Sequence, residues 1–342
     1  MSDPAFALSL AIVVALIYLV VLRLIDVNEK EPFWALGLVL FAGAFAGGLA
    51  FLLVPSTFRT LNVLGIAVTA EVAKFLALGV SVAALEGVGR ARGFSELNGL
   101  VDGVVYGAAV GLGFAVGETF AREAAVGGAT LVGGGALTAV WTTALSGLSE
   151  GVFGAILGAG IGGALAARSA AQRALLPVAG LIAALIVHYG YVAFAQGGSL
   201  AGDQGFVRAW IALLLPLLLV VVVMVQGLVQ ERGAIADELA DEAAGGAVTE
   251  EELARLRSPG ARRGAYARAL AKGDLTGFMA QRSLQNRQVQ LALTERRSRR
   301  ETDPTRKAAI DDEVHAIRAA ILAAKQEAGT GGRAPVGEGG AR

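Results

Sequence analysis

Four ionisable side chains lie inside otherwise apolar, membrane-length segments of this chain, each in a different segment: Glu71, Glu118, Glu150 and His188. A charged side chain near the centre of a bilayer costs about 2.5–3.5 kcal/mol on insertion scales, so four on successive segments indicate a buried polar site. Carboxylate oxygens and imidazole nitrogens are ligands for zinc, and a catalytic zinc takes three protein ligands and a water. A metal held in this way lowers the pKa of water toward about 7, and a further carboxylate can act as general base.

The composition indicates a membrane protein. The chain has 342 residues, of which 55% are hydrophobic and 17% charged, and its mean hydropathy is +0.61, which is too apolar for an ordinary soluble protein. The formal net charge is zero, so we expect no nucleic-acid partner. The absence of cysteine excludes disulfides and thiolate ligands. His315 lies in a polar region, so any metal in the apolar part would be held by His188 and carboxylates.

Seven stretches approach or exceed the roughly 20 apolar residues that a transmembrane helix needs. They are Phe6–Leu22, Phe33–Val54, Leu61–Ala84, Gly99–Phe120, Thr138–Ala166, Leu175–Ala195 and Phe206–Val229. The first lacks a basic leader and a small-residue cleavage site, so we expect a span and no signal peptide. We predict an all-α fold in which residues 1–230 form a polytopic bundle of about seven helices. A cytoplasmic helical tail over residues 231–330 and a disordered C-terminus over residues 331–342 would follow it.

Basic residues in the predicted loops set the expected orientation, because positive charge favours the cytoplasmic side. One set of alternate loops carries Arg23, Lys30, Arg90, Arg92, Arg168 and Arg173, and the other carries Arg59, Arg122 and Arg208. The bias predicts an N-terminus outside the cell membrane and a tail inside it.

The tail shows helical signals of its own. Thr249 followed by Glu252 has the form of a capping box. Apolar positions between Phe278 and Leu293, and again from Ile310 to Ala324, predict two further helices. Four arginines between positions 296 and 300 either form a solvated helix end or contact anionic lipid headgroups. The last dozen residues are rich in Gly, Pro and Ala, which is typical of disorder.

The surroundings of each intramembrane residue leave two interpretations open. Glu71 and Lys74 are three apart and share a helix face, so they form either a neutralising ion pair or a site carboxylate with a supporting cation. Glu118 either pairs with Arg122 near the membrane surface or belongs to the site. Glu150 has no basic residue within a turn, so it needs a metal or a cation from another helix to stay ionised. His188 is either a hydrogen-bonded core residue or a ligand.

Three segments carry a family resemblance. Asp26–Pro32 is an acidic segment that ends in Glu-Pro, Asp102–Ala115 is a long glycine-rich stretch, and Phe114 with Glu118 forms a Phe-x-x-x-Glu motif. In these features the chain resembles the PrsW family of intramembrane metalloproteases, which is related to the CAAX prenyl-protease group. The resemblance implies hydrolysis of single-span, membrane-anchored regulators such as anti-sigma factors.

The resemblance also implies a role for each candidate residue. Glu118, Glu150 and His188 would hold a metal, expected to be Zn²⁺. Glu71 would act as base or as an additional ligand, with Lys74 orienting it.

Two positions depart from the family's motifs. The family's Glu-Glu-x-x-Lys motif reads Ala70-Glu71-Val72-Ala73-Lys74 here, so the first glutamate is missing. Glu150 stands where the family has a histidine, whereas the last motif keeps its histidine at His188.

The departures keep other functions open beside the protease. One is a pseudoprotease that binds transmembrane partners without cutting them. Another is a proton-coupled transporter, because buried glutamate and histidine also form proton relays, although the sequence shows no inverted repeat or paired broken helices.

Overall fold

The computed structural model is all-helical over the residues that it describes. These are residues 4–26, 28, 30–53, 63–92, 97, 99–125, 135–196, 203–245, 247–258, 260–262, 264, 267, 271, 273 and 275–331. Within them no strand occurs, and seven helices are long and apolar enough to cross a membrane. The prediction of an all-α, seven-span protein is therefore confirmed.

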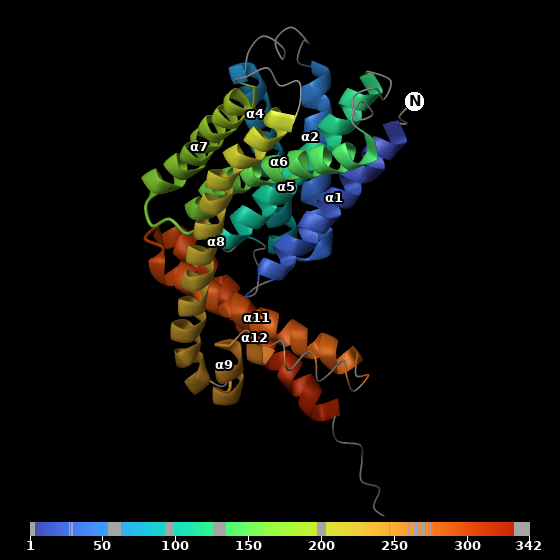
Figure 1. Ribbon diagram of the computed structural model, residues 1–342. Helices are drawn as coiled ribbons and strands as arrows, with labels where there is room; N and C mark the ends of the chain where they lie inside the picture. The colour runs from blue at the N-terminus through green and yellow to red at the C-terminus, as the bar shows by residue number, and fades with distance from the viewer. Residues whose placement is uncertain are drawn as a thin grey trace, which may run out of the picture. The chain divides into compact units, whose positions relative to one another are not determined.

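The spanning helices follow the predicted apolar stretches closely (Figure 1). They are α1 (Pro4–Ile25), α2 (Phe33–Leu53), α4 (Val63–Arg92), α5 (Leu100–Ala125), α6 (Gly135–Leu165), α7 (Ala170–Gln196) and α8 (Asp203–Gly245). The predicted span limits at Val54 and Leu61 lie outside the described residues, as do Arg59 and positions 332–342 of the predicted disordered end.

Two helices run beyond their apolar stretches. Helix α4 continues eight residues past the predicted end at Ala84, and α8 continues from Val229 to Gly245. In both cases the added residues are mostly strong helix formers such as Ala, Glu, Leu and Arg, so the backbone stays helical after the hydrophobic pattern stops. Hydropathy therefore located the spans but not the helix ends.

The contacts divide the chain into two compact units, each with its own hydrophobic core. The first contains Met1–Arg90 and Ser95–Val229, and the second contains Ala91–Phe94 and Gln230–Arg342. We call them the membrane unit and the tail unit.

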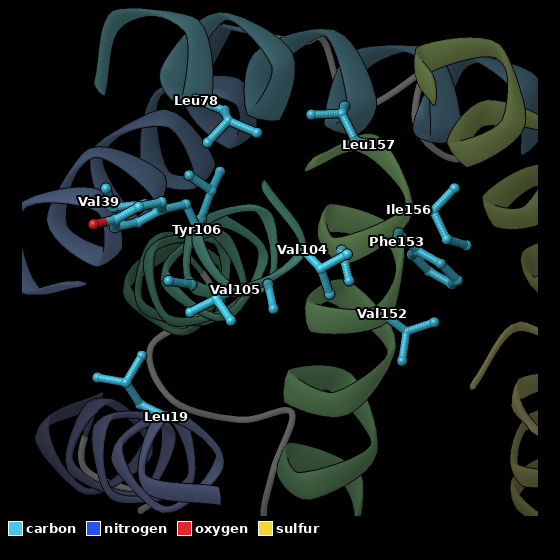
Figure 2. Close-up of a cluster of buried hydrophobic side chains, with 14 of the residues drawn as sticks. Leu19, Val39, Leu78, Val104, Val105, Tyr106, Val152, Phe153, Ile156 and Leu157 are labelled. Atoms are coloured by element: carbon cyan, nitrogen blue, oxygen red, sulfur yellow. The ribbon is translucent and has the colours of Figure 1, made fainter. Parts of the chain in front are cut away.

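Helix α5 lies at the centre of the membrane unit. In the most apolar 18-residue stretch of α5, 94% of the residues are buried, although the helix is only moderately hydrophobic. Leu19 from α1, Val39 from α2 and Leu78 from α4 pack around it, as Figure 2 shows, and side chains of α6 complete the cluster. The neighbours, not the lipid, surround this helix, which explains why it can be rich in glycine.

Glycines let α5 approach α6 until the backbones touch. A Cβ added at Gly107 would lie 2.2 Å from the carbonyl oxygen of Gly154. A Cβ added at Gly111 would lie 1.9 Å from the carbonyl oxygen of Glu150. The opposite face meets α2 in the same way, since a Cβ at Gly117 would lie 1.8 Å from the Ala44 carbonyl oxygen. Such small-residue interfaces favour close helix packing in membranes. The position of Glu150 is thus set by the surface of α5.

The tail unit packs the end of α8 against α9 (Glu250–Leu256), α11 (Leu275–Arg300) and α12 (Pro304–Gly331). Its buried core includes Leu239, Leu291 and Ile321. The capping box at the start of α9 is confirmed, because Thr249 Oγ1 accepts from the Glu252 amide and Glu252 accepts from the Thr249 amide.

Ion pairs join the helices of the tail unit. Arg299 lies 2.9 Å from Glu238 and 2.7 Å from Asp241 on α8, and Arg297 pairs with Glu313 on α12. These two arginines of the basic cluster therefore have protein partners, and the cluster is neither a simply solvated end nor wholly available to lipid.

Arg318 on α12 joins two carboxyl groups. Its Nη2 lies 2.5 Å from Glu242 on α8 and 2.9 Å from Glu295 on α11. Burial, followed by the hydrogen bond and the charge of Glu242, raises the pKa of Glu295 to about 7. A glutamate in the unfolded chain has a pKa near 4.3, so the folded tail holds a proton that the unfolded tail releases at neutral pH.

We expect Gly111→Ala to lower the free energy of unfolding by about 1–3 kcal/mol or more, because the methyl group must force α5 and α6 apart. Gly79→Ala on α4 is the matched control, since nothing lies within 4 Å of the added Cβ and alanine favours helix. Thermal unfolding of both variants in detergent measures the difference. Equal melting temperatures would show that the two helices do not meet at this backbone contact.

We expect the tail unit to lose stability as pH rises from about 4.5 to about 7. In this window the folded state binds more protons than the unfolded state at Glu295, so the slope of unfolding free energy against pH is negative. Glu295→Gln should flatten this part of the profile, whereas Asp312→Asn, at an exposed position on α12, should not. Hydrogen exchange of α11 and α12 at several pH values measures it, and an unchanged profile in Glu295→Gln would contradict the assignment.

Candidate metal centre

Three helices bring four ionisable side chains to one point in the membrane unit. Lys74 Nζ on α4 lies 2.5 Å from Glu71 Oε1 and 2.6 Å from Glu150 Oε2 on α6. His188 Nδ1 on α7 lies 2.7 Å from Glu71 Oε1, and its Nε2 lies 3.8 Å from Glu150 Oε1. All four residues are buried, and only Glu150 keeps a side-chain exposure of 10%. Residues far apart in the sequence therefore form one cluster.

The cluster supplies the counter-charge that Glu150 lacks on its own helix. A buried carboxylate without a counter-charge is strongly destabilised, and Glu150 has no cation on its own helix. Lys74 supplies the cation from α4, and it pairs with Glu71 on its own helix at the same time. With a neutral imidazole, the set carries two negative charges and one positive charge, so the cluster has a net charge of −1.

Three of the four residues form a ligand set that fits a metal ion. Glu71, Glu150 and His188 each offer one ligand atom, and these atoms lie within 4.8 Å of one another. Glu71 Oε2 is buried without a hydrogen-bond partner, so a carboxylate lone pair remains unused in the interior. One nitrogen and two oxygens are a donor set that zinc accepts. We conclude that the residues present fit a divalent metal.

Aromatic rings enclose the cluster. The Phe153 ring stacks on the His188 ring with centroids 4.6 Å apart and planes at 21°. The Lys74 ammonium lies 5.3 Å from the Phe114 ring centroid and 5.4 Å from that of Phe153, within the range of a cation–π contact. Tyr191 meets the edge of Phe153 at 5.4 Å. The rings limit the movement of the histidine and keep the surroundings weakly polar.

Glu118 is not brought into this cluster. Its carboxylate is 31% exposed and lies 4.0 Å from Arg122 Nη1. Phe114, which contacts Lys74, is one turn earlier on α5, and four residues of helix correspond to about 6 Å along the axis. The geometry matches the pair with Arg122, and the group of residues that could hold a metal ion contains Glu71 and not Glu118.

Sequence reasoning missed the bridge from Lys74 to Glu150 and the aromatic residue Phe153. The bridge joins residues 76 positions apart, which no spacing rule reveals. Phe153 follows Glu150 by three positions, so helical periodicity could have placed both on one face.

A family model described as PrsW family intramembrane metalloprotease matches residues 31–227. The match covers more than half of the chain. The chain belongs to the PrsW family. Comparisons with curated proteins and with solved structures each gave no match.

The PrsW match contains every residue of the cluster and ends before Gln230, where the larger segment of the tail unit begins. Family membership and seven apolar helices support an intramembrane protease that crosses the membrane several times. At the altered positions, Ala70 is buried and brings no carboxylate, whereas Glu150 still supplies a donor atom. One departure thus removes a carboxyl group, and the other replaces a nitrogen donor by an oxygen donor.

We expect Glu150→Gln to lower the free energy of unfolding by about 1.5–3 kcal/mol, because it replaces one of the two carboxylate hydrogen bonds of the buried Lys74 ammonium by a weaker bond to a neutral amide. Glu118→Gln is the matched control and should change stability by less than about 1 kcal/mol, since its pair with Arg122 is partly exposed. Melting temperatures of the metal-free variants in one detergent measure both effects. A larger loss in the control than in Glu150→Gln would contradict the placement of the two glutamates.

Proposed function

We propose that this chain is a zinc-dependent intramembrane protease that cleaves single-span, membrane-anchored regulatory proteins of the anti-sigma-factor kind. The observation that carries the proposal is the convergence of Glu71, Glu150 and His188 in the interior of a PrsW-family membrane unit. Charged groups at such depth are costly, and when present they mark functional sites.

Each side chain has a role that its contacts support. Glu71, Glu150 and His188 would hold the zinc ion, with Phe153 fixing the histidine ring. Lys74 offsets the charge of both carboxylates and orients them. When bound, the ion would polarise the scissile carbonyl and make water more acidic.

The proton steps fall to Glu71. Its Oε2 has no hydrogen-bond partner, so it would accept a proton from water while the water oxygen attacks the carbonyl carbon. The carboxyl group would then give this proton to the amide nitrogen as the C–N bond breaks, leaving a carboxylate and an amine. Glu71 would serve as both ligand and base in place of the glutamate that Ala70 lacks.

Substrate would reach the cluster from the bilayer. Glu150 has the most exposed side chain of the four, at 10% against 4% for His188, so its side of α6 is the proposed point of contact for a locally unwound segment. Backbone that is not helical is tolerated at membrane depth only where protein or water satisfies it, which a site between helices provides. We further propose a plasma-membrane location with an external N-terminus and a cytoplasmic tail, from the loop charges.

A second function is favoured by one specific contact. The Lys74 ammonium already neutralises part of both carboxylates, so the cluster can be stable without any metal. In that case the chain would be a pseudoprotease that holds transmembrane partners without cutting them.

For the wild-type protein we expect about one zinc per chain after purification, and His188→Ala should lose it, because it removes the nitrogen ligand. Cells that express wild type should yield new N-termini in single-span proteins, and cells that express Glu71→Gln should not. Elemental analysis and N-terminal proteomics of membrane fractions measure these outcomes, with Glu118→Gln as the active control. A metal-free wild type that produces no new termini would favour the pseudoprotease.

A further inference from the structure

The Lys74 ammonium occupies the space between the two carboxylates of the proposed centre. It contacts Oε1 of Glu71 and Oε2 of Glu150, and its side chain has no exposure. Zinc binds carboxylate oxygens at about 2.0–2.2 Å, so an ion held by these same groups needs space and lone pairs that the ammonium takes. Lysine and metal therefore compete for the same two partners.

We propose that Lys74 is a built-in competing cation that holds the site in a closed state without metal and sets its metal affinity. This inference rests on the metal role in the proposed function. It differs from a purely orienting role for Lys74, because it requires that the ammonium withdraw from at least one carboxylate when the metal is loaded.

The surroundings of Lys74 provide a place for this withdrawal. The rings of Phe114 and Phe153 lie 5.3 and 5.4 Å from Nζ, and aromatic faces within about 6 Å attract an ammonium group. A lysine side chain is flexible over four carbons, so a small rotation can break a carboxylate contact while the ring contacts are kept. The ammonium can thus stay buried after it leaves the carboxylates.

The charges predict the direction of the effect. With a neutral imidazole and both carboxylates ionised, the cluster carries −1 with Lys74 in place, and a divalent ion would bring it to +1 if the lysine remained. Repulsion between the ion and the retained ammonium is poorly screened in the interior and weakens metal binding. A neutral residue at position 74 should therefore tighten binding, whereas loss of an orienting group should weaken it.

The test titrates Zn²⁺ alone against a chelator of known affinity, using the full-length chain in detergent. Lys74→Gln keeps an amide donor and removes the charge, and we expect it to bind one zinc at least about tenfold more tightly than wild type. Lys74→Arg keeps the charge and should not gain affinity. The rise in melting temperature on adding zinc should be larger for Lys74→Gln than for wild type.

The site of binding is checked by a double variant. Adding His188→Ala to Lys74→Gln should abolish the tight binding, and persistence of tight binding in the double variant would overturn the proposal. If Lys74→Gln does not fold without metal, zinc present during expression should restore a folded, monodisperse protein. Failure of zinc to restore it would also overturn the proposal.

The zinc titration distinguishes failure of the lysine–metal competition from failure of the metalloprotease function. Equal or weaker zinc affinity in Lys74→Gln, with wild type still binding zinc, would overturn the competition and leave the metalloprotease standing. Absence of zinc binding in both proteins would overturn both.

Discussion

Compensation of charge in a buried interior is the constraint on which the membrane unit depends. Glu71 and Glu150 lie where an isolated carboxylate would be strongly destabilised. A single ammonium from Lys74 contacts both, and His188 completes the set from a third helix. Since the four partners come from three helices, the cluster can form only when α4, α6 and α7 are correctly packed. The site and the helix bundle therefore support each other.

Packing by small residues makes that arrangement possible. Lipid tails are as apolar as the helices, so the hydrophobic effect does little to drive helix association in a membrane. Close backbone packing therefore contributes more of the stability. Glycines on α5 meet α6 on one side and α2 on the other with no room for a methyl group. This contact passes directly through the Glu150 carbonyl group, so the same glycines that close the bundle position a site residue. The long glycine-rich stretch thus positions the cluster through the backbone of Glu150.

The tail unit also pairs carboxylates with cations, but its charged groups are less buried than those of the membrane unit. Its carboxylates and arginines are partly solvated, and several pairs join α8, α11 and α12. Glu295 shares Arg318 with Glu242 and keeps a proton near neutral pH. Its segment from Gln230 onward lies outside the family match, and the unit has its own hydrophobic core. It is a separate structural addition to the membrane unit.

The amino-acid sequence by itself determined the seven spans, the capping box at Thr249 and the presence of a buried polar site. Each of these depends on local composition or on spacing along one helix, which the sequence displays directly. Only the tertiary structure decided which polar residues meet. Lys74 reaches Glu150 from another helix, while Glu118, on the central helix and in a family motif, lies one turn beyond Phe114 and pairs with Arg122. Membership in one site depends on how helices rotate against each other about their own axes, and hydropathy carries little information about that rotation in a bundle with buried glycine faces.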